Sequence, residues 1–519
     1  MDYVIGMDIG TTSTKAVLYD LAGNVIDYTN YSYELYRDAT GMAEQEPEEI
    51  LEAVTASLKK VIAPINWQND KLRTVSFSSA NQSLIALDKN FQPLTRIITW
   101  GDTRAAAAAA KIKNSEQGQD LYERTGTPIH PMSSLCKITW LKEDVPEVYN
   151  KAAYYCGIKE YVLYRLFGIW QMDVSVASCT GMYNIFELQW DDKALAQTGV
   201  SKDQLPKVVD AYEQFSGMKE EYTKVTGCPQ DVTFVQGAFD GALSNLGVNA
   251  IDDGVAAVTI GTSGAIRMVS DHPVIDPKGR IFCYALTKEL WVIGGPVNNG
   301  GTVFSWAKDN LFDAEKSTAD LLAKDSYDLL TEIAAQVPAG SDGLLFHPFL
   351  GGERAPIWDA NARGSFLGLT QMHTRAHMIR AVLEGIVYNL YTVLLALEEV
   401  LGQPQSILAT GGFARSELWR QMLSDVFERP VTIPQAFESS CLGAAVVGMK
   451  SIGVIDDLAE VKNFVGKTET YAPNPDHFEV YRELVPIYIR LTRQLKTEYQ
   501  TIAEFQRKFA QKDLNFDES

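Results

Sequence analysis

Several residues and patterns that mark particular classes of protein are scarce in this chain of 519 residues. There are 6 cysteines, and they lie far apart: Cys136, Cys156, Cys179, Cys228, Cys283 and Cys441. No CxxC pair occurs, so a dense disulfide framework is excluded and free thiols in a reducing compartment are favoured. No HExxH or comparable ligand spacing occurs either, and we expect no transition metal held by the protein.

Basic charge and long apolar runs are scarce as well. The chain has 46 Lys and Arg residues against 66 Asp and Glu residues, giving a net charge of −20. Such a field repels phosphate backbones and anionic lipid surfaces, so we expect neither a nucleic-acid nor a membrane partner. The alanine run at residues 105–110 is too short to span a bilayer, and the start at Met1–Asp8 has no basic segment of an export signal. The expected location is the cytoplasm.

What the chain does contain is enough apolar side chain for large cores. Hydrophobic residues make up 46% and aromatic residues 10% of the sequence, and the length favours two to four domains. Strand and helix patterns interleave throughout, which predicts an α/β fold.

Two segments about half a chain apart follow the same pattern. Residues 3–9 read as a strand, Gly10–Ser13 as a tight turn and residues 15–19 as the returning strand. Residues 255–260, the turn Gly261–Gly264 and residues 265–268 repeat this order. The echo predicts a duplicated domain with a junction near residues 247–254.

Other elements follow from periodicity and capping. The pattern predicts a helix from Pro47 with the apolar stripe Ile50, Val54, Leu58 and Val61, a strand at 72–79, a helix from Thr374 to about Leu401, a strand at 406–410, a helix from Ser416, and an amphipathic helical extension from His477.

The two turns suit phosphate. Asp8, the Gly10–Ser13 turn and Lys15 place a carboxylate, backbone N–H groups, hydroxyls and a cation around one point. Taken alone, ordinary hairpin chemistry explains the first turn as well. Two such turns in two similar domains fit a polyphosphate held from both sides of a cleft. Neither turn contains GxxxxGK[ST], so the P-loop fold is disfavoured.

Four further positions allow two interpretations each. Asp240, beside the junction, fits a helix cap or a carboxylate aimed at a ligand. Gly411-Gly412 fits an ordinary strand-to-helix turn or a loop passing close to a ligand. The cluster at Trp100–Arg104 fits a polyol site or a solvated ion pair. His130, held between prolines, is structural or functional.

In order and spacing, these residues resemble the FGGY family of carbohydrate kinases. The resemblance covers roughly residues 3–490 and includes Gly6-x-Asp8-x-Gly10-Thr11-Thr12-Ser13-x-Lys15, the second turn and Gly411–Ser416. The C-terminal signature is complete, from Gly364–Leu369 to Ala381–Glu384, and the N-terminal signature at Met132–Glu143 fits until Asp144. Segments Arg124–Met132, Gly157–Tyr161 and Gly294–Gly301 look most like the gluconate kinases of that family.

The resemblance implies two actin-like, RNase H-type domains with an interdomain cleft for ATP and sugar. The expected ranges are 1–248 for an N-terminal sugar-binding and catalytic domain, 249–450 for a nucleotide-binding domain and 451–519 for a helical extension. ATP and Mg²⁺ are the implied cofactors, and a homodimer is left open.

The resemblance also implies roles for individual residues. Asp240 corresponds to the base on the acceptor hydroxyl, and Asp8 to a residue near Mg²⁺. The phosphate and nucleoside contacts are expected from Thr11, Thr12, Lys15, Gly261, Thr262, Gly411, Gly412 and Ser416. The sugar contacts are expected from Ala80, Asn81, Gln82, Trp100, Asp102, Arg104, His130 and Asp240. Gln82 stands where many members carry a histidine.

The expected reaction is therefore ATP-dependent phosphorylation of a sugar acid, D-gluconate to 6-phosphogluconate. Because an acidic chain must bind an acidic substrate, a local cation is needed, with Arg104 the first candidate and Lys159 or His130 the second. The alternatives are a xylulose or ribulose kinase of the same family, and an actin-like ATP-driven switch that needs no Trp100–Arg104 cluster.

Overall fold

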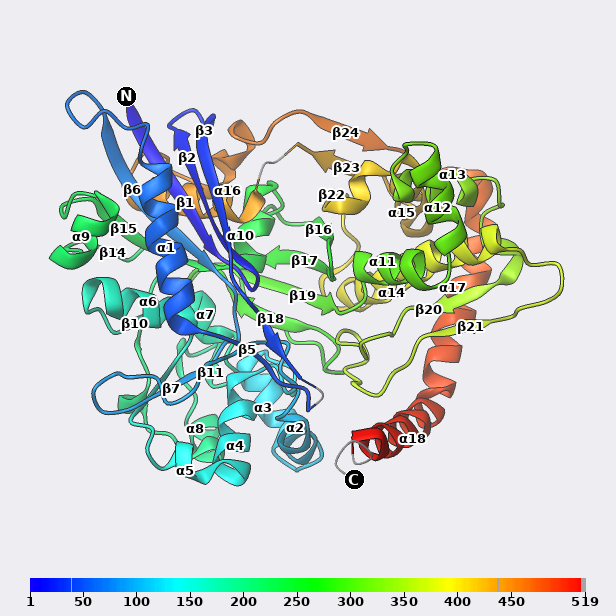
Figure 1. Cartoon of the computed structure of the whole chain (residues 1–519), viewed down its shortest axis with the longest axis horizontal. Helices are drawn as coiled ribbons and strands as arrows, with labels where there is room; N and C mark the ends of the chain where they lie inside the picture. Colours follow the sequence, from blue (N-terminus) through cyan, green and yellow to red (C-terminus); the bar gives the residue numbers. More distant parts are fainter. Residues whose placement is uncertain (39, 436–437, 515–519) are drawn as a thin grey trace. The chain divides into compact units, whose positions relative to one another are not determined.

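The computed structural model describes residues 1–38, 40–435 and 438–514, in which strands and helices alternate as predicted (Figure 1). Contacts divide the chain into two compact units. The first comprises Met1–Asp253, Val269–Ile293 and Gln435–Gly466, and the second comprises Gly254–Met268, Gly294–Pro434 and Lys467–Ser519. Each unit therefore consists of three separate segments of the chain. The expected domain ranges stay a prediction.

The main sheet of the first unit has the order β14-β15-β6-β1-β2-β3. The strands of the unit are β1 (Asp2–Ile9), β2 (Ser13–Asp20), β3 (Val25–Ser32), β4 (Tyr36–Arg37), β5 (Ala43–Gln45), β6 (Lys71–Ser79), β7 (Ile85–Leu87), β8 (Ile97–Ile98), β9 (Tyr154–Cys156), β10 (Gln171–Asp173), β11 (Tyr183–Asn184), β12 (Gln189–Trp190), β13 (Lys207–Val209), β14 (Gln214–Phe215), β15 (Thr233–Phe239) and β18 (Phe282–Ala285). Its helices are α1 (Pro47–Val61), α2 (Ala106–Lys113), α3 (Gly118–Thr125), α4 (Ser134–Asp144), α5 (Pro146–Tyr149), α6 (Ile158–Phe167), α7 (Val174–Ser178), α8 (Asp192–Thr198), α9 (Glu220–Thr226), α10 (Asp240–Gly247) and α16 (Ser439–Ser451).

Both faces of this sheet are covered. Alternate residues of β1, such as Ile5 and Met7, share one core cluster with Ile50 and Val54 of α1. The intervening Gly6 faces α16, where an added Cβ would stand 1.8 Å from the Cys441 carbonyl oxygen. A strand whose side chains alternate between two covered faces reads as a continuous apolar run, which is how residues 3–9 appear in the sequence.

Three parallel strands of this sheet end at the same level. Strand β1 runs parallel to β6, and β6 runs parallel to β15, with Ile9 opposite Ser79 and Ser79 opposite Phe239. The residues that follow these ends are Gly10, Ala80 and Asp240. The topology therefore gathers three predicted site segments at one edge of the sheet.

The second unit contains the strand order β19-β17-β16-β22-β23-β24. Its strands are β16 (Val255–Ile260), β17 (Gly264–Ser270) and β19 (Trp291–Val297), which lie mostly in this unit, with β20 (Leu345–His347), β21 (Ser365–Leu367), β22 (Ser406–Thr410), β23 (Val431–Pro434) and β24 (Thr468–Tyr471). Its helices are α11 (Gly301–Asn310), α12 (Asp313–Leu321), α13 (Ser326–Ala334), α14 (Arg375–Leu401), α15 (Glu417–Phe427), α17 (Phe478–Gln494) and α18 (Lys496–Leu514).

The predicted repeat is a repeat of topology. In the first unit β1 is antiparallel to β2 and parallel to β6. In the second unit β16 is antiparallel to β17 and parallel to β22, which in turn is parallel to β23. The order β3-β2-β1-β6-β15 thus matches β19-β17-β16-β22-β23 strand for strand.

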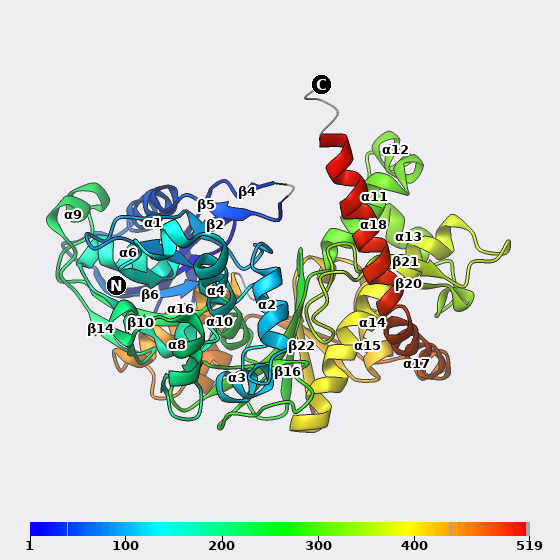
Figure 2. The same ribbon diagram turned by 90° about the horizontal axis from the view of Figure 1, so that it is seen from below.

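Two helical features of the second unit complete the fold. Helix α14 is long and apolar enough to cross a membrane, yet 78% of its most apolar window is buried inside the protein, as in a core helix. Helix α18 runs on from α17 in both views (Figures 1 and 2), which confirms the predicted helical extension. All six cysteines lie within the described residues, and each is buried and free.

Candidate active site

The turn after β1 is held in place by side chains from outside it. Gly10 N–H donates to the Ser13 carbonyl at 3.0 Å. The indole N–H of Trp100 donates to Thr11 Oγ1 at 2.9 Å, and the Tyr33 hydroxyl donates to the Gly10 carbonyl at 2.6 Å. Trp100, predicted to contact sugar, therefore also supports the predicted phosphate turn.

A carboxylate and an ion pair border this turn. Asp8 accepts a hydrogen bond from Ser78 Oγ at 2.6 Å, and Lys15 pairs with Glu438 at 2.6 Å. Burial raises the pKa of Asp8, while the hydrogen bonds of two serines and the charge of Lys15 act in the opposite direction. Among the described residues, no group of three or more His, Cys, Asp or Glu could hold a metal. Mg²⁺ needs no such cage, because it binds through one or two carboxylates together with substrate phosphates. Asp8 fits that requirement.

The predicted sugar loop meets the start of α10. Asn81 Nδ2 donates to Cys179 Sγ at 3.3 Å, and Gln82 Nε2 donates to the Tyr284 hydroxyl at 2.9 Å. Burial raises the pKa of Cys179 well above its usual value, and the charge of the nearby Asp240 contributes to this rise. The structure thus brings Asn81, Gln82 and Asp240 together around Cys179, and their contacts with a sugar stay a prediction.

Arg104 carries charge that is already matched within the first unit. Its guanidinium donates to Asp102 at 2.7 Å and also to Glu44, and it lies 4.8 Å from the centre of the Trp140 ring. Two carboxylates thus surround one cation. Lys159 is buried, ion-paired with Asp173 and bonded to the Gln236 carbonyl at 3.0 Å.

His130 lies in a turn, where its Nδ1 accepts a hydrogen bond from the Met132 N–H at 3.2 Å. The sugar contacts predicted for Arg104 and His130 stay predictions.

The second unit holds a pocket of ≈ 690 Å³ beside its own Gly-Thr turn. Gly261, Thr262, Gly412 and Ser416, all predicted for the nucleotide, line it together with Ile260, Gly301, Thr302, Phe304, Ser305, Asp325, Tyr327, Asp328, Thr331, Phe413, Arg415 and Trp419. Gly301 N–H donates to the Gly261 carbonyl at 2.7 Å, and Thr302 N–H donates to the Thr262 carbonyl at 3.1 Å. The turn therefore lies against the N-terminus of α11, where a helix favours negative charge.

The glycine at 411 is required by packing. Its φ is 114°, and a Cβ there would stand 2.1 Å from the Ile260 carbonyl oxygen. Beside it, Ser416 caps α15 by accepting a hydrogen bond from the Trp419 N–H at 3.2 Å. Aromatic rings of Phe304 and Trp419 meet edge to face at 5.7 Å. Phosphate-type donors at one end and rings at the other suit a nucleotide.

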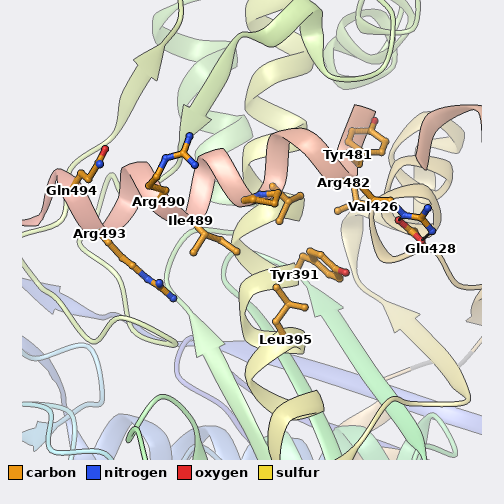
Figure 3. Close-up of a pocket in the computed structure, with 12 residues that line it drawn as sticks. Tyr391, Leu395, Val426, Glu428, Tyr481, Arg482, Ile489, Arg490, Arg493 and Gln494 are labelled. Atoms are coloured by element: carbon orange, nitrogen blue, oxygen red, sulfur yellow. Dashed lines mark hydrogen bonds and ion pairs between the residues drawn. The ribbon is translucent and has the colours of Figure 1, made fainter. Parts of the chain in front are cut away.

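Another pocket of the second unit, of ≈ 600 Å³, lies along α17. Figure 3 shows Arg490 and Arg493 extending to opposite sides of this helix. Arg482 is already paired with Glu428 at 2.5 Å. The arginine side chains that line this pocket do not converge on one point, so the pocket offers no anion site comparable to the one beside Gly261.

Comparisons with known proteins agree with this geometry. Residues 3–247 match the FGGY family of carbohydrate kinases, N-terminal domain, and residues 256–452 match its C-terminal domain. The chain belongs to the FGGY family of carbohydrate kinases, and it has their two-domain α/β fold.

A gluconokinase of Bacillus subtilis (strain 168) is 51% identical over 506 residues, covering 97% of this chain and 98% of that protein. Two crystal structures from Lactobacillus acidophilus are each 40% identical with a TM-score of 0.91. One, described as a ligand-bound xylulose kinase, covers 97% of this chain and 100% of its own, and the other, described as a gluconate kinase, covers 96% and 99%.

Sequence reasoning missed partners that come from distant parts of the chain. Tyr284 reaches Gln82, and Glu438 reaches Lys15, although more than 200 residues separate each pair. No site role was predicted for the aromatic residues Phe304 and Trp419. Only a tertiary arrangement reveals these roles, because helical spacing places apolar residues in a core and in a pocket wall alike.

Proposed function

We propose that this chain phosphorylates D-gluconate with ATP and releases 6-phosphogluconate and ADP. The observation that carries the proposal is the cluster of Asn81, Gln82 and Asp240 at the strand ends of the first unit, in a chain 51% identical to a gluconokinase. A half-buried carboxylate beside amide donors suits an acceptor hydroxyl that must lose a proton.

Asp240 is the proposed general base. It accepts the proton of the sugar hydroxyl while the hydroxyl oxygen forms a bond to the γ-phosphorus and the bond from that phosphorus to the β-γ bridging oxygen breaks. Such phosphoryl transfer passes through a loose transition state, so most of the catalysis comes from positioning and charge stabilisation.

The proposed nucleotide contacts divide between phosphate and nucleoside. In the second unit Gly261 and Thr262 bind phosphates, and Gly411, Gly412 and Ser416 lie by the nucleoside. In the first unit Thr11, Thr12 and Lys15 contact phosphates. Asp8 would hold Mg²⁺, which neutralises phosphate charge when bound.

The proposed sugar contacts are Ala80, Asn81, Gln82, Trp100, Asp102, Arg104 and His130. Because Asp102 and Glu44 surround the Arg104 guanidinium, the substrate carboxylate needs either a rearrangement of this triad or neutral N–H donors. Asn81 can supply such a donor, because Cys179 Sγ takes one of the two N–H groups of its Nδ2, whereas the two N–H groups of Gln82 Nε2 already donate to Tyr284 and Cys179.

The direct test is ADP release by the purified chain with a panel of aldonates and ketoses, followed by ³¹P NMR of the product. We expect gluconate to give the highest kcat/KM and a phosphomonoester at the terminal carbon. ADP release that no sugar stimulates would contradict a kinase and favour an ATP-driven switch.

A second candidate is a xylulose kinase, because one of the two equally similar crystal structures carries that description. The same panel decides between them. A higher kcat/KM for xylulose than for gluconate would replace the first proposal with the second.

A further inference from the structure

Lys137 is a charged residue with no access to solvent. It lies on α4 in the first unit with a relative exposure of 0%. Its Nζ donates to the Gln82 carbonyl and, at 3.2 Å, to the Ile98 carbonyl. Among the residues that the structure describes, no carboxylate forms an ion pair with it. A fully buried amine is compatible with a stable fold only if its hydrogen bonds to the protein compensate for the hydration that it loses.

Burial sets the electrostatics of this amine. Burial lowers the pKa of Lys137 to about 7, and the charge of Arg104 acts in the same direction, while the charges of Asp102 and Cys136 oppose it. An apolar side chain at this position would avoid this cost. The amine is therefore explained by the two carbonyl groups that it binds. The Gln82 carbonyl accepts from it, and the Ile98 carbonyl accepts from it in addition to the Leu84 N–H at 3.0 Å.

The two carbonyl groups belong to the two segments that carry the proposed sugar contacts. Gln82 lies in the loop between β6 and β7, and Ile98 ends β8, just before Trp100 and Arg104. One buried amine thus ties both segments to α4.

The backbone at Gln82 needs such a tie. Its φ is 57°, a left-handed conformation that a residue other than glycine adopts at an energetic cost. The side-chain amide is held at its other end by the Tyr284 hydroxyl and the Cys179 carbonyl, at 2.9 and 3.3 Å. Lys137 fixes the main chain of Gln82, and the other two contacts fix its side chain.

We propose that Lys137 is a positioning residue for the sugar, acting through Gln82 and through the segment after Ile98. The proposal rests on the proposed function, in that these segments bind the acceptor. Lys137 itself is enclosed by protein and touches neither substrate.

The test compares Lys137→Met, which keeps the side chain as far as the ε-carbon and removes the donor, with Lys137→Gln, which keeps a neutral donor. Lys142→Met is the matched control, because Lys142 is exposed on the same helix. For each variant the KM for sugar, the KM for MgATP, kcat and Tm are measured.

Lys137→Met should raise the sugar KM about 10-fold or more, the scale of one or two lost buried hydrogen bonds. The KM for MgATP should change less than the sugar KM, because the pocket at Gly261 is made by the second unit, and the Ile98 segment reaches a phosphate turn through the Trp100 hydrogen bond to Thr11. Lys137→Gln should raise the sugar KM about threefold, and Lys142→Met should leave it unchanged.

Equal changes in both KM values, or a loss of Tm with neither KM changed, would overturn the positioning role and leave a merely structural lysine. If Lys137→Met does not fold, the Lys137→Gln variant decides: its sugar KM should rise about threefold while its KM for MgATP changes less. The proposed function is judged separately on the wild-type chain. Should that chain prefer another sugar, the KM split is measured with that sugar.

Discussion

The two units use the same strand order around a Gly-Thr turn, yet they hold that turn in different ways. In the first unit the turn is fixed by side chains, above all by Trp100 on Thr11 and Tyr33 on Gly10. In the second unit it is fixed by the backbone at the start of α11. Of the side chains that hold the first turn, Trp100 belongs to a predicted sugar segment. In the second unit the backbone holds the turn, and side chains line the pocket proposed for the nucleotide.

The residue two positions before each turn also differs between the units. Asp8 precedes Gly10 in the first unit, and Thr259 occupies the equivalent place before Gly261 in the second. At this position of the duplicated frame, only the first unit carries an ionisable side chain. Four experiments probe this difference between the units, and they are given in order of decreasing expected effect.

The largest effect is expected at Asp240, the proposed general base in the first unit. Asp240→Asn should lower kcat about 10²-fold or more, because an amide cannot accept the hydroxyl proton. ATP affinity, measured by calorimetry, should remain near the wild-type value. Asp231→Asn, at the exposed opposite end of β15, is the control. Near-normal turnover in Asp240→Asn would remove this residue from the mechanism.

The second largest effect is expected at Gly411, where the backbone of the second unit packs closely. In Gly411→Ala the new methyl group would clash with the Ile260 carbonyl, a main-chain atom that cannot move aside alone. ATP binding should weaken about 10- to 100-fold, for a distortion costing roughly 1–3 kcal/mol. Gly402→Ala is the control, since Gly402 also has a positive φ of 80° but nothing within 4 Å of its Cβ position. Equal ATP affinities in the two variants would contradict the packing argument.

A smaller effect is expected at the brace of the first turn. Trp100→Phe removes the hydrogen bond to Thr11 and keeps an aromatic ring. One such bond contributes about 1 kcal/mol, so kcat/KM should fall about fivefold. Trp67→Phe, whose side chain is 41% exposed in the same unit, serves as the control. If both variants lose equally little, the turn does not depend on this side chain.

The smallest effect concerns stability against pH and has opposite signs in the two units. Burial lowers the pKa of His347 in the second unit from 6.5 to about 4, so the unfolded chain binds more protons between these values and stability falls as the pH falls. Burial raises the pKa of Glu160 in the first unit from 4.5 to about 7, so stability there falls as the pH rises through this window. Each group changes the free energy of unfolding by at most about 3 kcal/mol across this window.

Calorimetric Tm values between pH 4.5 and 6.5 reveal the two slopes. His347→Gln should lose the destabilisation at the acid end, and Glu160→Gln should lose the destabilisation at the neutral end. Two variants that keep the wild-type slope would show that neither group titrates as its burial requires.

Local patterns predicted most of the frame. The strand-turn-strand echoes appear as β1–β2 and β16–β17, and the stripe at Ile50, Val54, Leu58 and Val61 is the buried face of α1. These elements are recognisable because burial of one face imposes a period on the sequence.

Long-range partners could not be predicted in this way. Nothing in the segment around Arg104 indicates that Glu44 lies beside it, and nothing around Gln82 points to Tyr284. A hydrogen bond between distant segments depends on topology, and a periodic pattern describes only one segment at a time.

The position of α16 bears on how the chain is made. This helix packs directly on Gly6 of β1, yet the ribosome delivers it roughly 400 residues later, which at about 5–20 residues per second is some 20–80 s. During that interval α16 does not yet cover its face of the first sheet, and Gly6 lacks its contact with Cys441. A nascent chain stalled before residue 439 should therefore recruit chaperones that recognise exposed apolar strands, and should release them once Cys441 has emerged.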